Sequence, residues 1–197
     1  MSKDINILVL YYSSKGHVRA MAEHIARGVE LETQCYAVLR TVPGWGTSVD
    51  SIPDSGPLYV EKSDLRDCAG LALGSPTRFG NMAAPMKAFI DSTSDIWLSG
   101  ELADKPAAVF TSSSSMHGGQ ESTLLSMMLP LIHHGMVMVG LPYTEPGLAS
   151  TTAGGTPYGA SHVAGTKDEV RITAIEKDLC IALGKRIAGI AKRLRDD

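Results

Sequence analysis

Residues Ile5–Tyr12 read INILVLYY and run directly into Ser13–Val18, which read SSKGHV; the junction between these segments decides the fold. An almost uninterrupted apolar run of this length predicts a strand that is buried on both faces of a sheet. From Val18 to Val29 apolar residues recur three or four positions apart, as on one face of a helix. A buried strand, a polar turn and an amphipathic helix in this order predict the start of a parallel α/β sheet.

Four more apolar segments of strand length follow, and helical patterns separate them. The expected strands after the first are Thr33–Leu39, Ala69–Gly74, Ala107–Thr111 and Met136–Leu141. The expected helices after the first are Ala83–Ser92, Glu121–His134 and Ile172–Leu194. Pro130 should kink or shorten the second of these helices. We therefore predict an α/β fold with a doubly wound, five-stranded parallel sheet, helices on both faces, and a ligand at the carboxyl ends of the strands.

Two connecting segments, Thr41–Pro57 and Pro142–Lys167, are rich in proline and glycine. We expect both to be long loops, and loops of this length in a compact domain are often functional. A chain of 197 residues can bury a full core as one unit. We therefore expect a single domain over residues 1–197.

The composition argues against several classes of function. The formal net charge is −3 at pH 7, with no basic excess, so we expect no nucleic-acid partner and no membrane partner. No segment approaches the length of a membrane span, and the first residues do not resemble a signal peptide, so we expect a cytoplasmic protein. The three cysteines are scattered and form no C-x-x-C pair, which gives no support for a metal site or a redox dithiol.

The turn after the first strand has the features of a phosphate site. It consists of Ser13, Ser14, Lys15, Gly16, His17 and Val18. Hydroxyls, backbone N–H groups and a helix N-terminus can together hold one phosphate, and Gly16 allows the backbone to approach it. The turn matches neither G-x-x-x-x-G-K-[ST] nor G-x-G-x-x-G, which disfavours a nucleoside triphosphate and a dinucleotide. A mononucleotide such as FMN fits this pattern, and an ordinary capped turn is the alternative.

Two further polar turns follow expected strands, at Gly74–Met82 and at Ser112–Gln120. All three turns lie at carboxyl ends of strands, so they should meet at one edge of the sheet. The second and third could surround a flat heteroaromatic ring with backbone donors. Serine, glycine and asparagine also mark ordinary loops, so each turn alone is weak evidence.

Longer motifs run through almost the whole chain. The most specific are Ser75–Met82 (SPTRFGNM) and Gly154–Ala160 (GGTPYGA), with Gly118–Glu121 (GGQE) and His133–Met136 (HHGM) between them. On these motifs the chain resembles the tryptophan-repressor-binding-protein (WrbA) family of NAD(P)H:quinone oxidoreductases. The resemblance implies a flavodoxin-like fold, bound FMN, a homotetramer, and two-electron reduction of a quinone substrate with NADH or NADPH as hydride donor.

The resemblance also implies a set of site residues. The FMN phosphate would be bound by Ser13, Ser14, Lys15, Gly16, His17 and Val18. The ring would be lined by Pro76, Thr77, Arg78, Phe79 and Gly80 and by Ser112, Ser113, Ser114, Ser115, Met116, His117 and Gly118. His133 would reach the flavin from a neighbouring loop or subunit, and Trp97 would lie over the substrate. Lys15 departs from the family, whose members often carry an aromatic residue there, and the third turn is one residue longer than in the best-known members.

The residues suggest no protein nucleophile, so the flavin is expected to carry the chemistry. One open face of the ring would serve both substrates in turn, which predicts ping-pong kinetics. The alternatives are a flavodoxin-type electron carrier and a non-enzymatic regulatory binding protein. A net charge near zero gives little support to the first, and the chain offers no basic helix for DNA. Trp97 could instead be a packing residue, Arg78 a surface ion-pair partner, and His133 a cation at a helix end.

Overall fold

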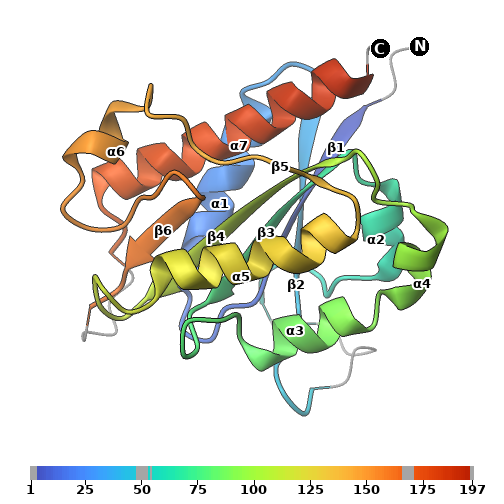
Figure 1. Ribbon diagram of the computed structural model, residues 1–197, viewed down its shortest axis with the longest axis horizontal. Coiled ribbons are helices and arrows are strands. Elements are labelled where there is room, and N and C mark those ends of the chain that lie inside the picture. The colour runs from blue at the N-terminus through green and yellow to red at the C-terminus, as the bar shows by residue number, and fades with distance from the viewer. Residues whose placement is uncertain (1–3, 48–52, 54, 166–170, 196–197) are drawn as a thin grey trace.

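The computed structural model describes residues 4–47, 53, 55–165 and 171–195, which form a sheet of strands joined mostly through helices (Figure 1). The strands are β1 (Ile5–Tyr11), β2 (Cys35–Thr41), β3 (Gly70–Pro76), β4 (Pro106–Ser113), β5 (Val137–Met138) and β6 (Ala160–Val163). The helices are α1 (His17–Glu30), α2 (Lys62–Asp67), α3 (Ala84–Asp91), α4 (Ser94–Ser99), α5 (Gln120–His133), α6 (Pro146–Ser150) and α7 (Ala174–Arg195).

All strand pairs are parallel, and the sheet has the order β2-β1-β3-β4-β5, with β6 also paired to β4. The chain winds from β1 outward to β2 and then returns to β3 on the other side of β1. The strand order therefore reverses between β1 and β3, which is the point where a doubly wound sheet opens a crevice. The predicted α/β fold with five parallel strand positions is confirmed.

The fifth strand position is filled by two separate segments. Val137 pairs with Pro106, whereas Ala160 pairs with Phe110 farther along β4. The apolar run Met136–Leu141 predicted one strand, but β5 ends after Met138. Pro142 cannot donate to the ladder, and the chain leaves the sheet near it. The segment predicted as a loop, Pro142–Lys167, instead contains α6 and β6, and β6 completes the edge.

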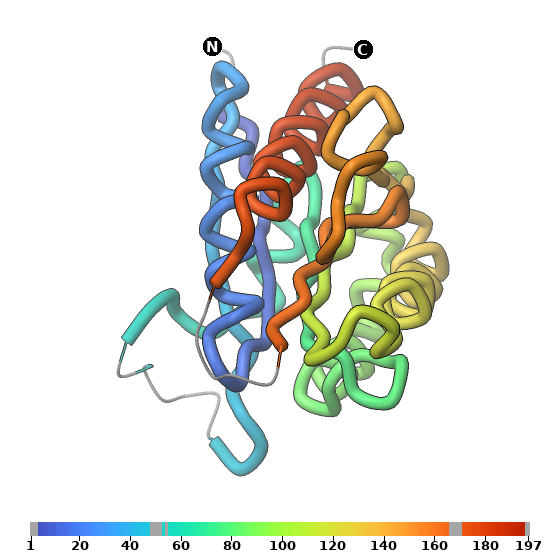
Figure 2. The backbone as a smooth tube through the Cα atoms, turned by 90° about the vertical axis from the view of Figure 1, so that its left-hand side faces the viewer, coloured from blue at the N-terminus to red at the C-terminus, as the bar shows by residue number. Residues whose placement is uncertain are grey.

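Helices cover both faces of the sheet, as predicted. Ile7 and Val9 of β1 belong to the core cluster that α1 and α7 share, whereas Leu8 and Leu10 belong to the cluster formed with α2, α3, α4 and α5. Side chains alternate between the two faces of a strand, so a strand buried on both faces is apolar throughout. In Figure 2, α1 and α7 run side by side on one side of the strands and α5 lies on the other.

The predicted helices are present with small shifts of their ends, and α5 continues past Pro130 to His133. The short helices α2, α4 and α6 were not predicted from the sequence. Within the described ranges, none of the helices combines the length and the apolar character that a membrane span needs.

Two glycines allow α1 and α7 to touch through their backbones. A Cβ on Gly28 of α1 would overlap the carbonyl of Ile181, and a Cβ on Gly184 of α7 would overlap the carbonyl of Ile25. The contact is reciprocal, so neither helix can give way without moving from the sheet. Because the turn that follows β1 leads directly into α1, this helix contact also fixes the position of that turn.

Gly184→Ala should lower the free energy of unfolding by about 2–3 kcal/mol, because interiors at native density tolerate an added methyl poorly. The matched control is Gly189→Ala in the same helix, where a Cβ would come no nearer than 3.8 Å to other atoms. This control should be neutral or more stable by up to about 1 kcal/mol, because alanine favours helix. Urea unfolding measures both, and equal effects would contradict the close helix contact.

Candidate active site

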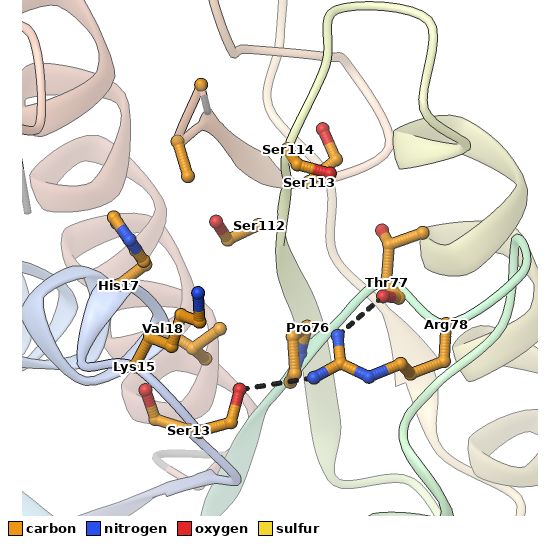
Figure 3. A pocket seen from close by; sticks show the side chains of 13 residues that line it. Ser13, Lys15, His17, Val18, Pro76, Thr77, Arg78, Ser112, Ser113 and Ser114 are labelled. Carbon is orange, nitrogen blue, oxygen red and sulfur yellow. Dashed lines mark hydrogen bonds between the residues drawn. The ribbon is translucent and has the colours of Figure 1, made fainter. Parts of the chain in front are cut away.

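A pocket of about 390 Å³ opens at the carboxyl ends of β1, β3 and β4 (Figure 3). It is lined by Ser13, Ser14, Lys15, His17, Val18, Pro76, Thr77, Arg78, Ser112, Ser113, Ser114, Ala164 and Gly165. The three polar turns predicted to meet at one edge of the sheet therefore do so. Ala164 and Gly165 were missed because they follow β6, a strand that was not predicted.

The N-terminus of α1 forms one wall of the pocket. Gly16 has φ 87°, in the left-handed region, and its N–H donates to Ser13 Oγ at 3.1 Å. The first helical hydrogen bond of this turn runs from the Ala20 N–H to the Gly16 carbonyl, so the preceding N–H groups have no partner within the helix. The first turn of α1 contains no acidic residue. The helix dipole and the two serines make this wall suitable for an anion.

Hydroxyl groups fix the opposite wall. Thr77 Oγ1 lies 3.3 Å from Thr111 Oγ1 and accepts from Thr123 Oγ1 at 3.1 Å, while Thr111 donates to the Ser75 carbonyl at 2.7 Å. The Thr77 N–H donates to the Ser112 carbonyl at 2.9 Å. These contacts join the turn after β3 to both β4 and α5, so Thr77 is held in one place.

Arg78 spans the pocket mouth. Its Nη2 donates to Ser14 Oγ at 3.1 Å and its Nη1 to the Thr77 carbonyl at 2.9 Å. Figure 3 shows Lys15 and His17 on the α1 side of the pocket and Thr77 and Arg78 across from them. Lys15 and Arg78 give the pocket two cationic side chains, which suits an anionic ligand.

The turn after β4 lies mostly at the rim. Ser113 Oγ donates to the Ser115 carbonyl at 2.7 Å, and the Gly118 N–H donates to the same carbonyl at 3.1 Å. The outer part of this turn, namely Ser115, Met116, His117 and Gly118, does not line the pocket. A Cβ on Gly119 would come within 3.0 Å of Gly80 Cα, so two glycines hold this turn against the turn after β3.

Phe79 occupies a strained position at the rim. Arg78 and Asn81 exchange backbone hydrogen bonds of 2.7 and 3.0 Å across a two-residue turn formed by Phe79 and Gly80. Both turn residues have positive φ, 51° at Phe79 and 76° at Gly80. Such turns favour asparagine followed by glycine, and a phenylalanine there costs free energy. The Phe79 side chain is fully exposed, so no packing against the described residues offsets that cost.

Trp97 and His133 lie together but not at this pocket. Trp97 Nε1 donates to the His133 carbonyl at 2.8 Å, joining α4 to the carboxyl end of α5. The turn after β4 stands at the other end of this 14-residue helix, roughly 20 Å away. Within one chain, therefore, neither residue lines the pocket, and the expectation that Trp97 lies beside an open face of the site is not met by a single copy.

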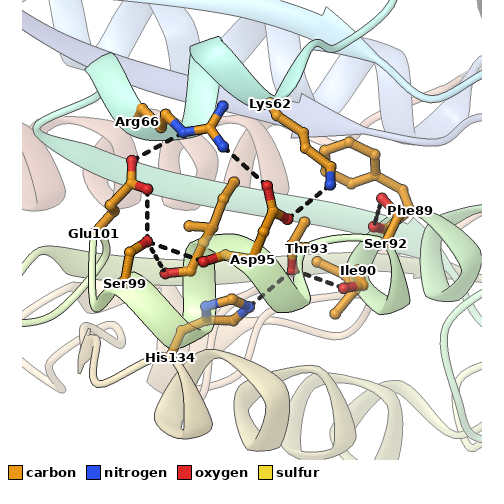
Figure 4. Close-up of polar contacts among 11 residues, drawn as sticks. Lys62, Arg66, Phe89, Ile90, Ser92, Thr93, Asp95, Ser99, Glu101 and His134 are labelled. Carbon is orange, nitrogen blue, oxygen red and sulfur yellow. Dashed lines mark hydrogen bonds and ion pairs between the residues drawn. The ribbon is translucent and has the colours of Figure 1, made fainter.

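Polar contacts fasten α4 to its neighbours (Figure 4). Asp95 binds Lys62 and Arg66 of α2 at 2.7 and 2.9 Å, and the pKa of Asp95 is lowered chiefly by its hydrogen bond from Lys62. On the other side, the buried His134 places Nε2 3.0 Å from Thr93 Oγ1, and burial lowers the pKa of this imidazole. Trp97 therefore belongs to a helix whose position is fixed by polar contacts with α2 on one side and with His134 on the other.

Comparison with known proteins identifies the family. Residues 5–144 match the family described as NADPH-dependent FMN reductase. The chain belongs to this family. It is also 40% identical to a protein of Solidesulfovibrio magneticus named NAD(P)H dehydrogenase (quinone), over 97% of this chain and 100% of that protein. A protein of Geotalea daltonii with the same name is 42% identical, over 96% of this chain and 98% of its own length.

Solved structures support the fold of this FMN reductase family member. A WrbA-like flavodoxin from Agrobacterium tumefaciens superposes with a TM-score of 0.72 at 23% identity, covering 96% of this chain and 99% of that one. A flavodoxin from the domain Archaea superposes with a TM-score of 0.63 at 21% identity, covering 95% and 99%. The flavodoxin-like fold and the family expected from the motifs are thus confirmed, and FMN is the cofactor that they imply.

The strain at Phe79 gives a prediction about the turn after β3. Phe79→Asn should raise the free energy of unfolding by about 1 kcal/mol, because asparagine adopts positive φ more readily. Phe79→Leu is the control, since it also removes the ring but keeps the strain, and it should bring no such gain. Urea unfolding of both variants measures the difference. Equal stability of the Asn and Leu variants would show that the backbone here is not strained.

Proposed function

We propose that the chain acts as a single-domain, FMN-dependent NAD(P)H:quinone oxidoreductase whose flavin binds in the pocket between α1 and Arg78. The observation that carries this is the meeting of an anion-suited helix N-terminus with two polar turns at the switch point of the sheet. The names of the two bacterial relatives, NAD(P)H dehydrogenase (quinone), support a quinone as the electron acceptor.

The pocket residues fit FMN by their chemistry. The hydroxyls of Ser13 and Ser14, the backbone after Gly16 and the cation of Lys15 would hold the phosphate. The turns around Thr77 and Ser113 would flank the ring. The residues that flank the ring would be Pro76, Thr77, Arg78, Phe79, Gly80, Ser112, Ser113 and Ser114, together with the rim residues Ser115, Met116, His117 and Gly118.

FMN held in this pocket would supply two-electron chemistry, as the acceptor of a hydride from NADH or NADPH and the donor of two electrons to the quinone. The chain would supply binding and electrostatics. Arg78, held at the pocket mouth by Ser14, would stabilise negative charge on the reduced ring. The threonine network around Thr77 keeps this wall in place, so little reorganisation would be needed during turnover.

The function is tested by spectroscopy under anaerobic conditions. Purified protein with bound flavin should lose its visible flavin absorbance on addition of NADH or NADPH and regain it on addition of benzoquinone. Steady-state consumption of NAD(P)H with benzoquinone and no other protein separates the enzyme from an electron carrier and from a regulatory binding protein. Release of FAD rather than FMN on heating, or the absence of turnover, would refute the proposal.

We also propose that both substrates use one face of the flavin in turn. Because the turns after β3 and β4 would flank the ring, one face of the ring would remain open to both substrates. Double-reciprocal plots should then be parallel, and each substrate should inhibit competitively against the other at high concentration. Intersecting plots would indicate a ternary complex and two separate substrate sites.

A homotetramer would explain where Trp97 and His133 act. Leu125, Leu129 and Ile132 form an exposed apolar stripe along α5, and exposed Leu98 lies beside Trp97 on α4. Contiguous exposed apolar side chains of this kind mark contact surfaces. We propose that packing of these helices against other copies brings Trp97 and His133 to the pocket of a neighbouring copy. Light scattering that shows a monomer over a wide concentration range would refute this.

Trp97→Ala should slow the quinone half-reaction about two- to tenfold, because the stacking of an aromatic ring is worth roughly 0.5–1.5 kcal/mol. FMN affinity should change little. Trp97→Phe keeps a ring and loses only the hydrogen bond to His133, so it should retain most of the rate. Stopped-flow reoxidation by benzoquinone measures both variants. Equal losses in the two would show that the hydrogen bond matters and the stacking surface does not.

We place the protein in the cytoplasm. Cys35, Cys68 and Cys180 are all buried free thiols, which suits a reducing compartment.

A further inference from the structure

Three side chains form a hydrogen-bonded line from the pocket into the interior. His17 lines the pocket, and its Nδ1 lies 3.3 Å from Nε2 of His162 on β6. His162 Nδ1 lies 3.0 Å from Oε2 of Glu176 on α7. His162 and Glu176 are inaccessible to solvent, and His17 is 8% exposed. His17 lies 145 residues before His162 in the sequence, and neither His162 nor Glu176 was singled out from it.

Glu176 is a buried carboxylate with a full set of partners. Its Oε1 accepts from the N–H groups of Gly154 and Val163, at 2.8 and 2.9 Å, and its Oε2 accepts from the Thr173 N–H at 2.9 Å. Burial alone would raise the pKa of Glu176, but the hydrogen bonds from His162 and from the backbone outweigh it and lower the pKa to about 2. The group is therefore ionised at neutral pH.

An ionised Glu176 places a proton on the nearer ring nitrogen of His162. A carboxylate only accepts, so His162 Nδ1 must carry a proton and donate to it. If His162 carries no second proton, its Nε2 is an acceptor and His17 Nδ1 donates to it. The imidazole of His17 is thus held by its Nδ1 edge, which leaves Nε2 as the ring nitrogen directed away from His162.

The other ionisable groups nearby do not replace this arrangement. Cys180 of α7 faces Glu176, but burial raises the pKa of this thiol above its usual range, so it remains neutral. Lys15 and Arg78 line the same pocket as His17. Among the described residues, no three His, Cys, Asp or Glu side chains converge as metal ligands. The three groups form a line rather than a cage.

We propose that Glu176 and His162 are positioning residues that hold His17 so that its Nε2 edge binds the phosphate of FMN. This inference rests on the proposed function, which puts the phosphate at the N-terminus of α1. A proton on Nε2 makes His17 a cationic donor, and Glu176 balances that charge through His162. The carboxylate thus acts on the cofactor without touching it.

Two amide variants of His162 break the line at different points. The amide of asparagine stands where Nδ1 of histidine stood, so His162→Asn keeps a donor to Glu176 and loses the contact with His17. The amide of glutamine stands where Nε2 stood, so His162→Gln keeps an acceptor for His17 and loses the contact with Glu176. The proposal expects the Asn variant to bind FMN about tenfold more weakly. The Gln variant, which keeps the acceptor for His17 but loses the link to Glu176, should bind FMN more tightly than the Asn variant and more weakly than the unaltered protein.

Riboflavin, which lacks the phosphate, separates the phosphate end from the rest of the pocket. Protein freed of flavin is titrated with FMN and with riboflavin, and binding is followed by quenching of flavin fluorescence. The Asn variant should lose FMN affinity and keep its riboflavin affinity. Equal losses for both ligands, equal losses in both variants, or no loss in the Asn variant would overturn the proposal. If the unaltered protein does not prefer FMN over riboflavin, the proposed placement of the phosphate fails instead.

Imidazole ¹⁵N spectra of the unaltered protein provide a test that does not depend on the folding of a variant. His162 should show a proton on Nδ1. The signals of His17 should shift when FMN is added and should shift much less with riboflavin. A His162 protonated on Nε2 alone, or an identical response to both ligands, would overturn the proposal.

Discussion

Parallel pairing of a strand buried on both faces is the constraint on which the rest of this structure depends. Parallel neighbours cannot be joined by tight hairpins, so the chain must cross over between them through helices, which cover the two faces. The carboxyl ends of β1, β3 and β4 then lie at the same edge of the sheet. The turns after β1, β3 and β4 meet there because of this topology, and no single turn needs an unusual sequence for the pocket to form.

The same constraint explains what could be predicted from the sequence. The long apolar runs of β1, β3 and β4 and the three polar turns were all visible, because burial on both faces leaves a continuous signal. The division of the fifth strand position between β5 and β6 was not visible in the sequence. β5 pairs through only two residues, and Ala160–Val163 is too short for its pattern to differ from that of a loop. Trp97 and His133 were assigned by resemblance, and only the length of α5 reveals that one chain keeps them from the pocket.

One departure from local backbone preference lies beside the pocket, and two others, at Gln34 and Asp104, lie elsewhere in the described fold. Phe79 adopts a positive φ that suits asparagine or glycine, and it does so with a fully exposed ring. Gly16 and Gly119 also have positive φ, at the two helix N-termini that border the site. Elsewhere, at Gly28 and Gly184, glycine serves close packing instead. The strain at Phe79, next to the pocket-lining Arg78, supports its proposed place among the residues that flank the ring.

Glu176 shows how one buried charge can serve the fold and the site together. Its carboxylate accepts hydrogen bonds from the N–H groups of Gly154, Val163 and Thr173, and these bonds hold the segment around β6 against α7. Because its pKa falls from 4.5 to about 2 on folding, its ionised form stabilises the protein above pH 4.5, and this contribution is lost as the pH falls toward 2. The hydrogen bond that Glu176 accepts from His162 contributes to the same lowering of its pKa. The stability of the sheet edge and the orientation of His17 therefore depend on one ionisation state, which links the cofactor pocket to the fold that forms it.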